Sequence, residues 1–317
     1  MLGALGATGA LLLVGCSDDG VGTEDTSSST APGSSTTTSS ITGDTPTTGG
    51  SQPGTSSGES TGDASSSTGP GADCNPADAW ATGGTAAMTA KDCYPDPFAG
   101  GVQSCVLICG TTAGPCTADT MDREDVSEGL GGLPVRLALL IVDATTCMPV
   151  PGARVEIWHT QRTGVYSGNT PNPGFCAGGD ADAPNHLYFR GSRTADDDGR
   201  VDFDTCYPGW YPGRAIHIHF RVYLGDQATV TSQLFFDDAL SEQIFASHPD
   251  YSEFGQPNTT NDVDNVIGGE DDLSPYLLDV ARMPDGAMLA SKVIGVRTDL
   301  NADACTLGNG MMPPPMP

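Results

Sequence analysis

The stretch GWYPGRAIHIHF, residues 209–220, places two histidines one residue apart within an apolar run. Alternate side chains of a β-strand lie on the same face, so His217 and His219 are expected to point one way. Ile218 and Phe220 are then expected to point the other way, into a core. A His-X-His pair on one strand face is a common pair of metal ligands, although the pattern also fits ordinary histidines on a polar face.

Short runs of strand character, bounded by turn residues, surround this stretch. The turn ADDDG (195–199) predicts a hairpin between its two flanking strands, and DALSEQIFA (238–246) predicts one or two helical turns. Several strands at this spacing predict an all-β fold, an antiparallel β-sandwich. The expected strands cover residues 133–144, 153–160, 188–194, 200–206, 215–224, 228–236 and 288–298.

The first 16 residues, MLGALGATGALLLVGC, are apolar and too short to span a bilayer. Their ending resembles a bacterial lipobox, which predicts an export signal that is cut before Cys16 and a lipid on that cysteine. No Lys or Arg precedes the apolar run, so we expect the true start upstream, with a twin-arginine signal. Export and a lipid anchor in the cell envelope are therefore expected, at the outer membrane because Ser17 follows the cysteine.

The rest of the chain divides by composition. Residues 17–72 are rich in Ser, Thr, Gly and Pro and predict a disordered tether. A Cys-rich segment (73–118), the sandwich domain (119–300) and a tail (301–317) are expected to follow. The 13 basic and 40 acidic residues give a net charge of −27, which argues against a nucleic-acid partner.

The chain has ten cysteines, and nine remain if Cys16 carries a lipid. In an exported chain these predict disulfides, with at least one cysteine free or bonded between chains and the pairing left open. A zinc site is the alternative for three clustered cysteines, Cys105, Cys109 and Cys116. Their spacing lacks a paired CxxC and no histidine lies near, so disulfides are favoured.

The two strand histidines alone would leave a metal short of ligands, and the adjoining turn offers no Asp, Glu or Cys. Tyrosines lie close by instead, at Tyr207, Tyr211 and Tyr223, with Tyr166 further back in TGVYSG. A phenol has a pKa of about 10 and stays neutral unless a strongly Lewis-acidic ion removes its proton. Hard phenolate oxygens suit ferric iron better than zinc or copper(I).

Several blocks of the sequence, in order, resemble the intradiol ring-cleavage dioxygenases, the family that includes protocatechuate and catechol dioxygenases. The resemblance covers residues 104–298 and implies a β-sandwich. The sequence is most similar to the exported, lipoprotein-like branch of the family. The blocks are CVLICGTTAGPC, REDVSEG, CMPVPGARVEIWHTQRTGVYSG, YFRGSRTADDDGRVDFDTCYPGWYPGRAIHIHF, TSQLFF and TTNDVDNV.

Position by position, the resemblance implies four ligands to one non-haem Fe(III). They match Tyr166, Tyr211, His217 and His219, with Tyr211 rather than Tyr207 as the second tyrosine. No organic cofactor is implied. The implied reaction joins a catechol, bound through both of its oxygens, with O2 and gives a cis,cis-muconate-type product.

The resemblance also implies roles for residues beside the iron. Tyr211, in the axial position, would leave the metal and take up a substrate proton. Arg214 would stabilise the negative charge that builds on the ring, as a fixed donor does. Gln233 would position the substrate or the developing oxygen centre.

Departures from the family pattern leave the substrate open. Gly213 stands where protocatechuate enzymes carry a tryptophan, cysteines replace a stretch resembling TPEQTEGP, and no N-terminal helical dimerisation region precedes the domain. The alternatives are an exported binding module that keeps the sandwich without catalysis, or a structural surface protein. The complete Tyr, Tyr, His, His, Arg set favours catalysis.

Other residues with chemical potential have plainer interpretations. His159 is expected to be structural, with a role behind the metal ligands as the alternative, and the acidic segment 262–272 is expected to be a solvated loop. DDDG (196–199) is interpreted as a turn rather than a calcium loop. Loop positions are expected for His186 and His248, and core positions for Trp158 and Trp210.

Overall fold

The computed structural model describes residues 74–102 and 104–307, which belong to one unit, Ser67–Pro317. The predicted export signal, Cys16 and the predicted tether lie outside the described residues. No helix within the described part of the chain has the length and apolarity needed to cross a membrane.

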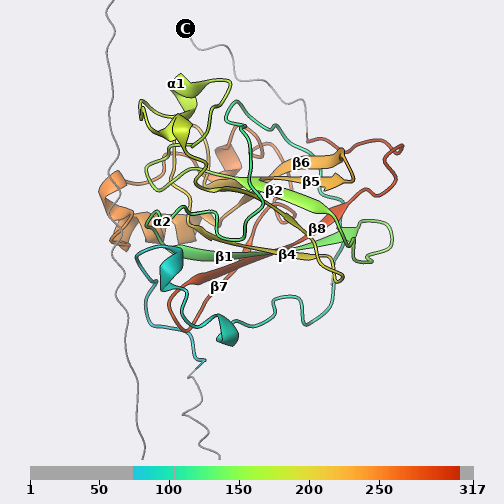
Figure 1. Ribbon diagram of the computed structural model, residues 1–317, viewed down its shortest axis with the longest axis horizontal. Coiled ribbons are helices and arrows are strands. Elements are labelled where there is room, and N and C mark those ends of the chain that lie inside the picture. The colour runs from blue at the N-terminus through green and yellow to red at the C-terminus, as the bar shows by residue number, and fades with distance from the viewer. Residues whose placement is uncertain (1–73, 103, 308–317) are drawn as a thin grey trace, which may run out of the picture. The chain divides into compact units, whose positions relative to one another are not determined.

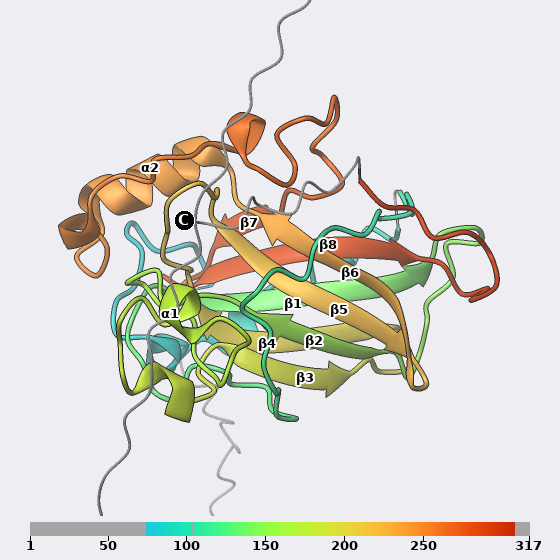
Figure 2. The same ribbon diagram turned by 90° about the horizontal axis from the view of Figure 1, so that it is seen from above.

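The described residues form two four-stranded sheets that lie one above the other (Figures 1 and 2). The predicted β-sandwich is confirmed, with all strand pairs antiparallel except the parallel pair β1 and β8. The first sheet has the order β4 (Arg200–Cys206), β1 (Pro134–Asp143), β8 (Met288–Val296), β7 (Asp279–Arg282). The second has the order β3 (Arg190–Thr194), β2 (Arg154–Trp158), β5 (His217–Leu224), β6 (Gln227–Phe235).

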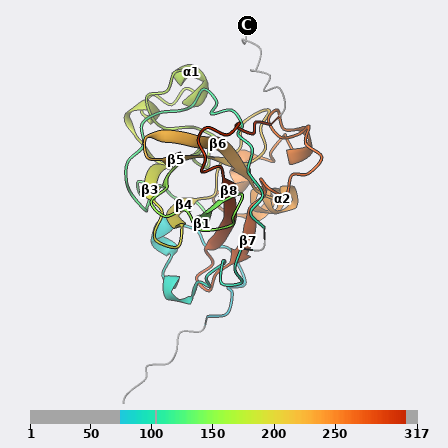
Figure 3. The same cartoon turned by 90° about the vertical axis from the view of Figure 1, so that its right-hand side faces the viewer.

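Strand β1 is apolar almost throughout because both of its faces are covered. Its odd positions, such as Leu137 and Leu139, are fully buried in the core between the sheets. On the other face, Ala138 packs in a second cluster with Met88. The N-terminal segment that carries Met88 runs below the first sheet, on the side away from the second sheet (Figure 3). Burial on both faces explains why the run does not alternate.

The predicted hairpin across ADDDG is wrong, although its turn forms. The amide of Asp196 donates to the carbonyl of Arg200 at 2.9 Å, and Gly199 has a φ of 77°. Strand β3 nevertheless pairs with β2, and β4 pairs with β1, so the turn joins the two sheets. Turn residues act locally, whereas the partner of a strand is decided by which neighbour buries its apolar side chains.

The remaining elements are short and mostly follow the prediction. The helical turns expected at 238–246 form α2 (Asp238–Ser247), whose N-cap Asp237 accepts from the amide of Leu240. The short helix α1 (Pro173–Cys176) and strand β7 were not predicted, and both helices lie at the same end of the sandwich (Figures 1 and 2). The 3-10 helices are Thr85–Ala87, Lys91–Cys93, Ala183–Asn185, Ser252–Phe254 and Asn261–Val263.

Disulfides, rather than zinc, account for the clustered cysteines, as expected. The four bonds join Cys74–Cys93, Cys105–Cys147, Cys109–Cys305 and Cys116–Cys176. The three clustered cysteines therefore take three separate partners. Cys206 remains free and buried, which fits the expected odd cysteine.

Candidate metal centre

Four side chains from one strand and two loops converge at one end of the second sheet. His217 and His219 project from the same face of β5, while Ile218 and Phe220 are buried in the main core. The two Nε2 atoms of the histidines lie 3.2 Å apart. Tyr166 comes from the loop after β2, and its hydroxyl lies 3.3 Å from Nε2 of His217 and 3.2 Å from Nε2 of His219.

Tyr211, from the turn before β5, completes this group, which we call the Tyr2His2 cluster. Its hydroxyl lies 3.4 Å from the hydroxyl of Tyr166 and 3.3 Å from Nε2 of His217. Tyr207, on the same segment, points elsewhere and shares a 2.7 Å hydrogen bond with Ser241. The structure thus brings together the four residues that the resemblance implied, and it separates Tyr207 from them.

The spacing of the four donor atoms fits a shell around one ion. Hydrogen bonds that involve nitrogen are normally about 2.7–3.2 Å long, most often near 2.9–3.0 Å, and the separations of 3.2–3.4 Å here lie at or beyond the upper end of that range. Ligands at about 2.0–2.1 Å from a shared metal lie about 3.3 Å from one another in a four-coordinate shell. Within the described residues, no group of three or more His, Cys, Asp or Glu is arranged to hold a metal ion, so phenol oxygens are needed to complete the cluster.

Burial prepares both histidines as neutral ligands, and a hydrogen bond also orients His217. Nδ1 of His217 donates to the carbonyl of Ala215 at 2.6 Å, which leaves the lone pair of its Nε2 free toward the cluster. His219 stacks on Trp158, with ring centroids 4.8 Å apart. Burial, together with the nearby charge of Arg214, holds the pKa of both histidines well below the usual range.

Burial has the opposite consequence for the two tyrosines. It raises the pKa of Tyr166 well above that of a free phenol, and the neighbouring Tyr211 adds to the effect. Burial also raises the pKa of Tyr211, against the opposing charge of Arg214. Both phenols therefore keep their protons unless a strongly Lewis-acidic cation enters the cluster.

Arg214 and Gln233 lie beside the cluster. Nη1 of Arg214 is 3.4 Å from the hydroxyl of Tyr211, and its Nη2 donates to Oε1 of Gln233. The amide of Gln233 in turn donates to the carbonyl of Thr112 at 2.9 Å. The guanidinium group thus connects the cluster with β6 and with the segment that holds Thr112.

Two charged residues of the site were missed by the sequence analysis. Asp264 was expected in a solvated loop, but its carboxylate is fully buried and pairs with Nε of Arg214 at 2.9 Å. Arg190, inside YFRGSRT, is also fully buried, and its guanidinium carbon lies 6.0 Å from the centroid of the Tyr166 ring. Neither residue carries a local sequence signal, because the partners of both come from distant segments.

Arg190 ties two segments together behind the cluster. It donates to the carbonyl of Cys116 at 2.7 Å and to the carbonyl and hydroxyl of Ser167. Among the described residues no carboxylate pairs with it, and its Nη1 has no partner. Burial lowers the pKa of Arg190 to about 10.

The Cys116–Cys176 disulfide forms one wall of the cluster. Both cysteines are buried with Trp158 and Tyr166 in a small apolar group, and the amide of Tyr166 donates to the carbonyl of Cys176 at 2.8 Å.

Gly213 is one of the departures from the family pattern noted above, and its φ is 83°. A Cβ there would lie 3.2 Å from Nδ2 of Asn265, so this position favours glycine.

The remaining predicted side chains divide between core and surface. His159 is fully buried and bonds to the hydroxyl of Thr205 at 2.7 Å and to the carbonyl of Thr160, which supports its structural interpretation. Trp158 is buried, as expected, whereas Trp210 is only partly buried. His186 and His248 lie outside the helices and strands, although His248 is buried and caps α2.

Comparisons with known proteins agree with the fold and point to one class of enzyme. Residues 113–262 match a family model described as Dioxygenase, and the matched range contains the whole cluster, Arg214 and Gln233. An intradiol ring-cleavage dioxygenase from Tetranychus urticae is 25% identical with a TM-score of 0.54, covering 63% of this chain and 98% of its own. In this stretch the chain is similar to dioxygenases of the intradiol ring-cleavage type, whose fold it shares.

Two other solved structures were also found to be similar. A further dioxygenase crystal structure, 24% identical with a TM-score of 0.53, covers 63% of this chain and 98% of its own and shows the same fold. A hydroxyquinol 1,2-dioxygenase from Pseudomonas putida DLL-E4 is 20% identical with a TM-score of 0.44 and covers 62% and 68%. A search of curated protein sequences found no match.

Proposed function

We propose that this domain is a non-haem Fe(III) dioxygenase that uses O2 to cleave a catechol-type ring between its two hydroxylated carbons. The expected product is a cis,cis-muconate-type diacid. The observation that carries the proposal is the convergence of two phenol oxygens and two imidazole nitrogens at 3.2–3.4 Å from one another. The similarity to the Dioxygenase family model and to a solved intradiol ring-cleavage dioxygenase supports the same reaction class.

The donor set fits ferric iron better than other common metals. Tyr166, Tyr211, His217 and His219 would hold the ion, with two hard phenolate oxygens that offset much of its charge. When bound, the iron supplies a Lewis acid that accepts both catechol oxygens and activates the ring toward O2. The raised pKa of both tyrosines means that the phenolate form depends on the metal.

The surroundings of the two tyrosines suit them to different tasks. Tyr166 is buried, and its backbone amide is tied to Cys176 beside a disulfide, so it serves as a fixed ligand. Tyr211 lies in a turn, is partly exposed, and its hydroxyl faces Arg214. Its oxygen is therefore the one placed to accept a proton from an incoming catechol.

Arg214 and Gln233 act on the substrate rather than on the metal. The guanidinium group is held at the edge of the cluster, where negative charge builds on the ring as it becomes a ketone. Gln233 is fully buried and fixed at both ends of its amide, by Arg214 and by the carbonyl of Thr112. A preorganised donor of this kind costs no rearrangement during the reaction.

The proposed location of the enzyme is the cell envelope. The lipobox-like ending at Cys16 and the composition of residues 17–72 support a lipid-anchored domain on a tether. Metabolic labelling with a fatty acid would test this, because Cys16→Ser is expected to abolish the label. Label that survives this substitution would contradict the anchor.

Oxygen consumption with a panel of substituted catechols tests the proposed reaction. The iron-loaded protein is expected to consume O2 and to give a product whose mass equals that of the substrate plus both oxygen atoms. A matched control is Tyr207→Phe, which changes a tyrosine of the same segment that lies outside the cluster. Iron-loaded protein that binds catechols without consuming O2 would instead establish the alternative, a binding module.

A further inference from the structure

Asp264 is the most completely engaged carboxylate of the site. It follows the 3-10 helix Asn261–Val263, and its side chain is fully buried. One carboxylate oxygen accepts from Nε of Arg214 at 2.9 Å and from the amide of Ala215 at 2.8 Å. The other accepts from the amides of Val266 and Ile267 and lies 3.4 Å from Nη2 of Arg214. Backbone donors on both oxygens fix the orientation of the carboxylate.

Arg214 is oriented by this carboxylate on one side and by Gln233 on another. The Nε edge of its guanidinium group faces Asp264, and Nη2 reaches Gln233. Nη1 is thereby directed at the cluster, 3.4 Å from the hydroxyl of Tyr211 and 3.5 Å from Nε2 of His217. The arginine side chain is only 12% exposed, so water cannot replace the carboxylate as its partner without cost.

We propose that Asp264 is a positioning residue for the ring-cleavage reaction: its buried carboxylate holds the guanidinium group of Arg214 against the Tyr2His2 cluster. The effect on catalysis rests on the proposed function, but the effect on the position of Arg214 does not. Asp264 does not touch the cluster itself. It acts through Arg214, as an outer-shell residue that orients a group in the site.

A purely structural role is the competing explanation, because Asp264 also accepts from the amide of Ala215 just before β5. Asp264→Asn separates the two roles. An asparagine keeps a side-chain oxygen that accepts from backbone amides, but it loses the negative charge that pairs with Arg214. The matched control is Asp262→Asn, which removes an exposed carboxylate from the same loop.

Activity is one arm of the test. Asp264→Asn is expected to lower kcat by about 10–100-fold, the range usual for residues that orient groups in a site, while iron content stays that of the unmodified protein. The double variant Asp264→Asn with Arg214→Met is expected to be no slower than Arg214→Met alone, because the carboxylate acts through the arginine. Losses that multiply in the double variant would overturn the proposal.

A crystal structure of Asp264→Asn is the second arm and does not depend on turnover. Nη1 of Arg214 is expected to move out of contact with the hydroxyl of Tyr211, while the Tyr2His2 cluster and strand β5 stay in place. An arginine that keeps its position would overturn the inference, whatever the activity. Unmodified protein that binds iron yet consumes no O2 would contradict the proposed function and leave this structural arm intact.

Discussion

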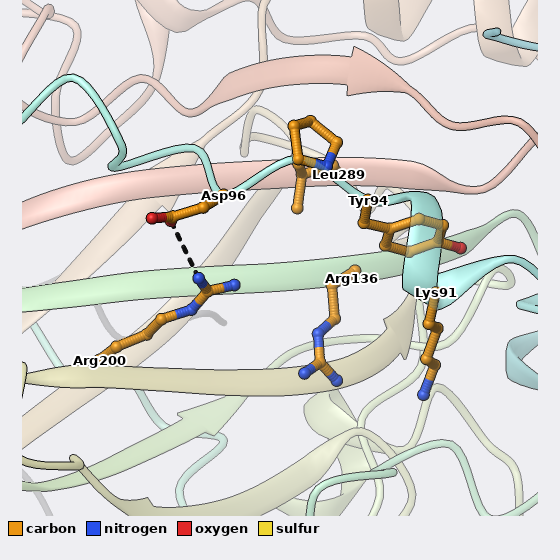
Figure 4. Close-up of a pocket in the computed structure, with 7 residues that line it drawn as sticks. Lys91, Tyr94, Asp96, Arg136, Arg200 and Leu289 are labelled. Carbon is orange, nitrogen blue, oxygen red and sulfur yellow. Dashed lines mark hydrogen bonds and ion pairs between the residues drawn. The ribbon is translucent and has the colours of Figure 1, made fainter. Parts of the chain in front are cut away.

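Two groups of charged and polar side chains in this domain differ in one respect: the charges of the first are all paired, whereas the second has ligand atoms free to bind a metal. The first is a cavity of about 150 Å3 on the outer face of the first sheet, which we call the outer-face pocket (Figure 4). The second is the Tyr2His2 cluster at the end of the second sheet. The outer-face pocket is lined by Lys91, Tyr94, Pro95, Asp96, Arg136, Arg200 and Leu289.

Every cation of the outer-face pocket already has a carboxylate partner. Lys91 pairs with Asp204, and Arg200 pairs with Asp96, the contact drawn in Figure 4. Arg136 pairs with three carboxylates, those of Glu124, Asp202 and Asp204. The ion pairs of the pocket therefore join the N-terminal segment to the first sheet, and none of its cations is left unpaired.

The Tyr2His2 cluster differs in chemistry rather than in the number of its polar atoms. Its four groups are neutral in the protein alone, and they face one another at distances longer than good hydrogen bonds. Lone pairs that converge without a partner mark a place for a ligand. The paired charges of the outer-face pocket, by contrast, indicate a structural role.

The largest effect is expected from removing one phenol of the cluster. Tyr166→Phe should lower both iron content and ring cleavage by more than about 100-fold, because a direct ligand is lost. Tyr207→Phe, in a buried tyrosine that bonds to Ser241, should leave both unchanged. Metal analysis measures the iron content of the two purified variants, and oxygen uptake measures their rate of ring cleavage. Equal iron in both variants would contradict the assignment of Tyr166.

Two disulfides of similar span offer the next comparison. Cys116–Cys176 and Cys105–Cys147 close loops of 60 and 42 residues, so removing either is expected to cost about 4 kcal/mol of stability at most. Only the first borders Tyr166 and Trp158. The double alanine variant of Cys116 and Cys176 should therefore also bind iron more weakly, as titration with ferric iron would reveal. The same weakening in both variants would place the effect in general stability.

The outer-face pocket should affect stability without affecting catalysis. Burial opposes the charge of Arg136, but its bonds to the three carboxylates outweigh burial and raise its pKa. Arg136→Met would remove the cation that the three carboxylates share and leave each with one other basic partner, so it should lower the free energy of unfolding by up to about 3 kcal/mol. Denaturant titration measures this loss. The activity per iron should stay within about 2-fold of the unmodified protein, and a larger fall would link the two places.

The smallest expected effect is a loss of folding stability in acid that depends on His159. Burial lowers the pKa of His159 to about 4, whereas an unfolded histidine titrates near 6.5. The unfolded state therefore binds the proton first, and stability falls as the pH falls from 6.5 toward 4. The loss between pH 6.5 and pH 5 is about 1.5 kcal/mol for this group. His159→Gln should reduce the measured loss by that amount, and an unchanged pH dependence would show that His159 already carries its proton.

Sequence patterns predicted the elements better than their partners. The alternation around Ile218 and Phe220 placed β5 and the direction of its histidines, because the period of a strand is a local property. The turn at ADDDG was also found, but the sheets that its flanking strands join were not. Pairing depends on burial across the whole domain, and the same reason left the disulfide partners open.

The site shows the same division between local and distant information. The Tyr2His2 cluster, Arg214 and Gln233 were implied by motifs that resemble a family. Asp264 lies among exposed acidic residues, and nothing local distinguishes its buried carboxylate from Asp262. Arg190 bonds to carbonyls of Cys116 and Ser167, whose approach only the folded chain provides.

The visible absorption of purified, iron-loaded protein tests the central claim most directly. Two phenolate ligands on ferric iron are expected to give a wine-coloured protein, with a charge-transfer band that shifts or bleaches when catechol is added without oxygen. Tyr166→Phe should lose the band and Tyr207→Phe should keep it. Protein that stays colourless and free of iron after reconstitution would contradict the claim that the two tyrosines and two histidines hold a ferric ion.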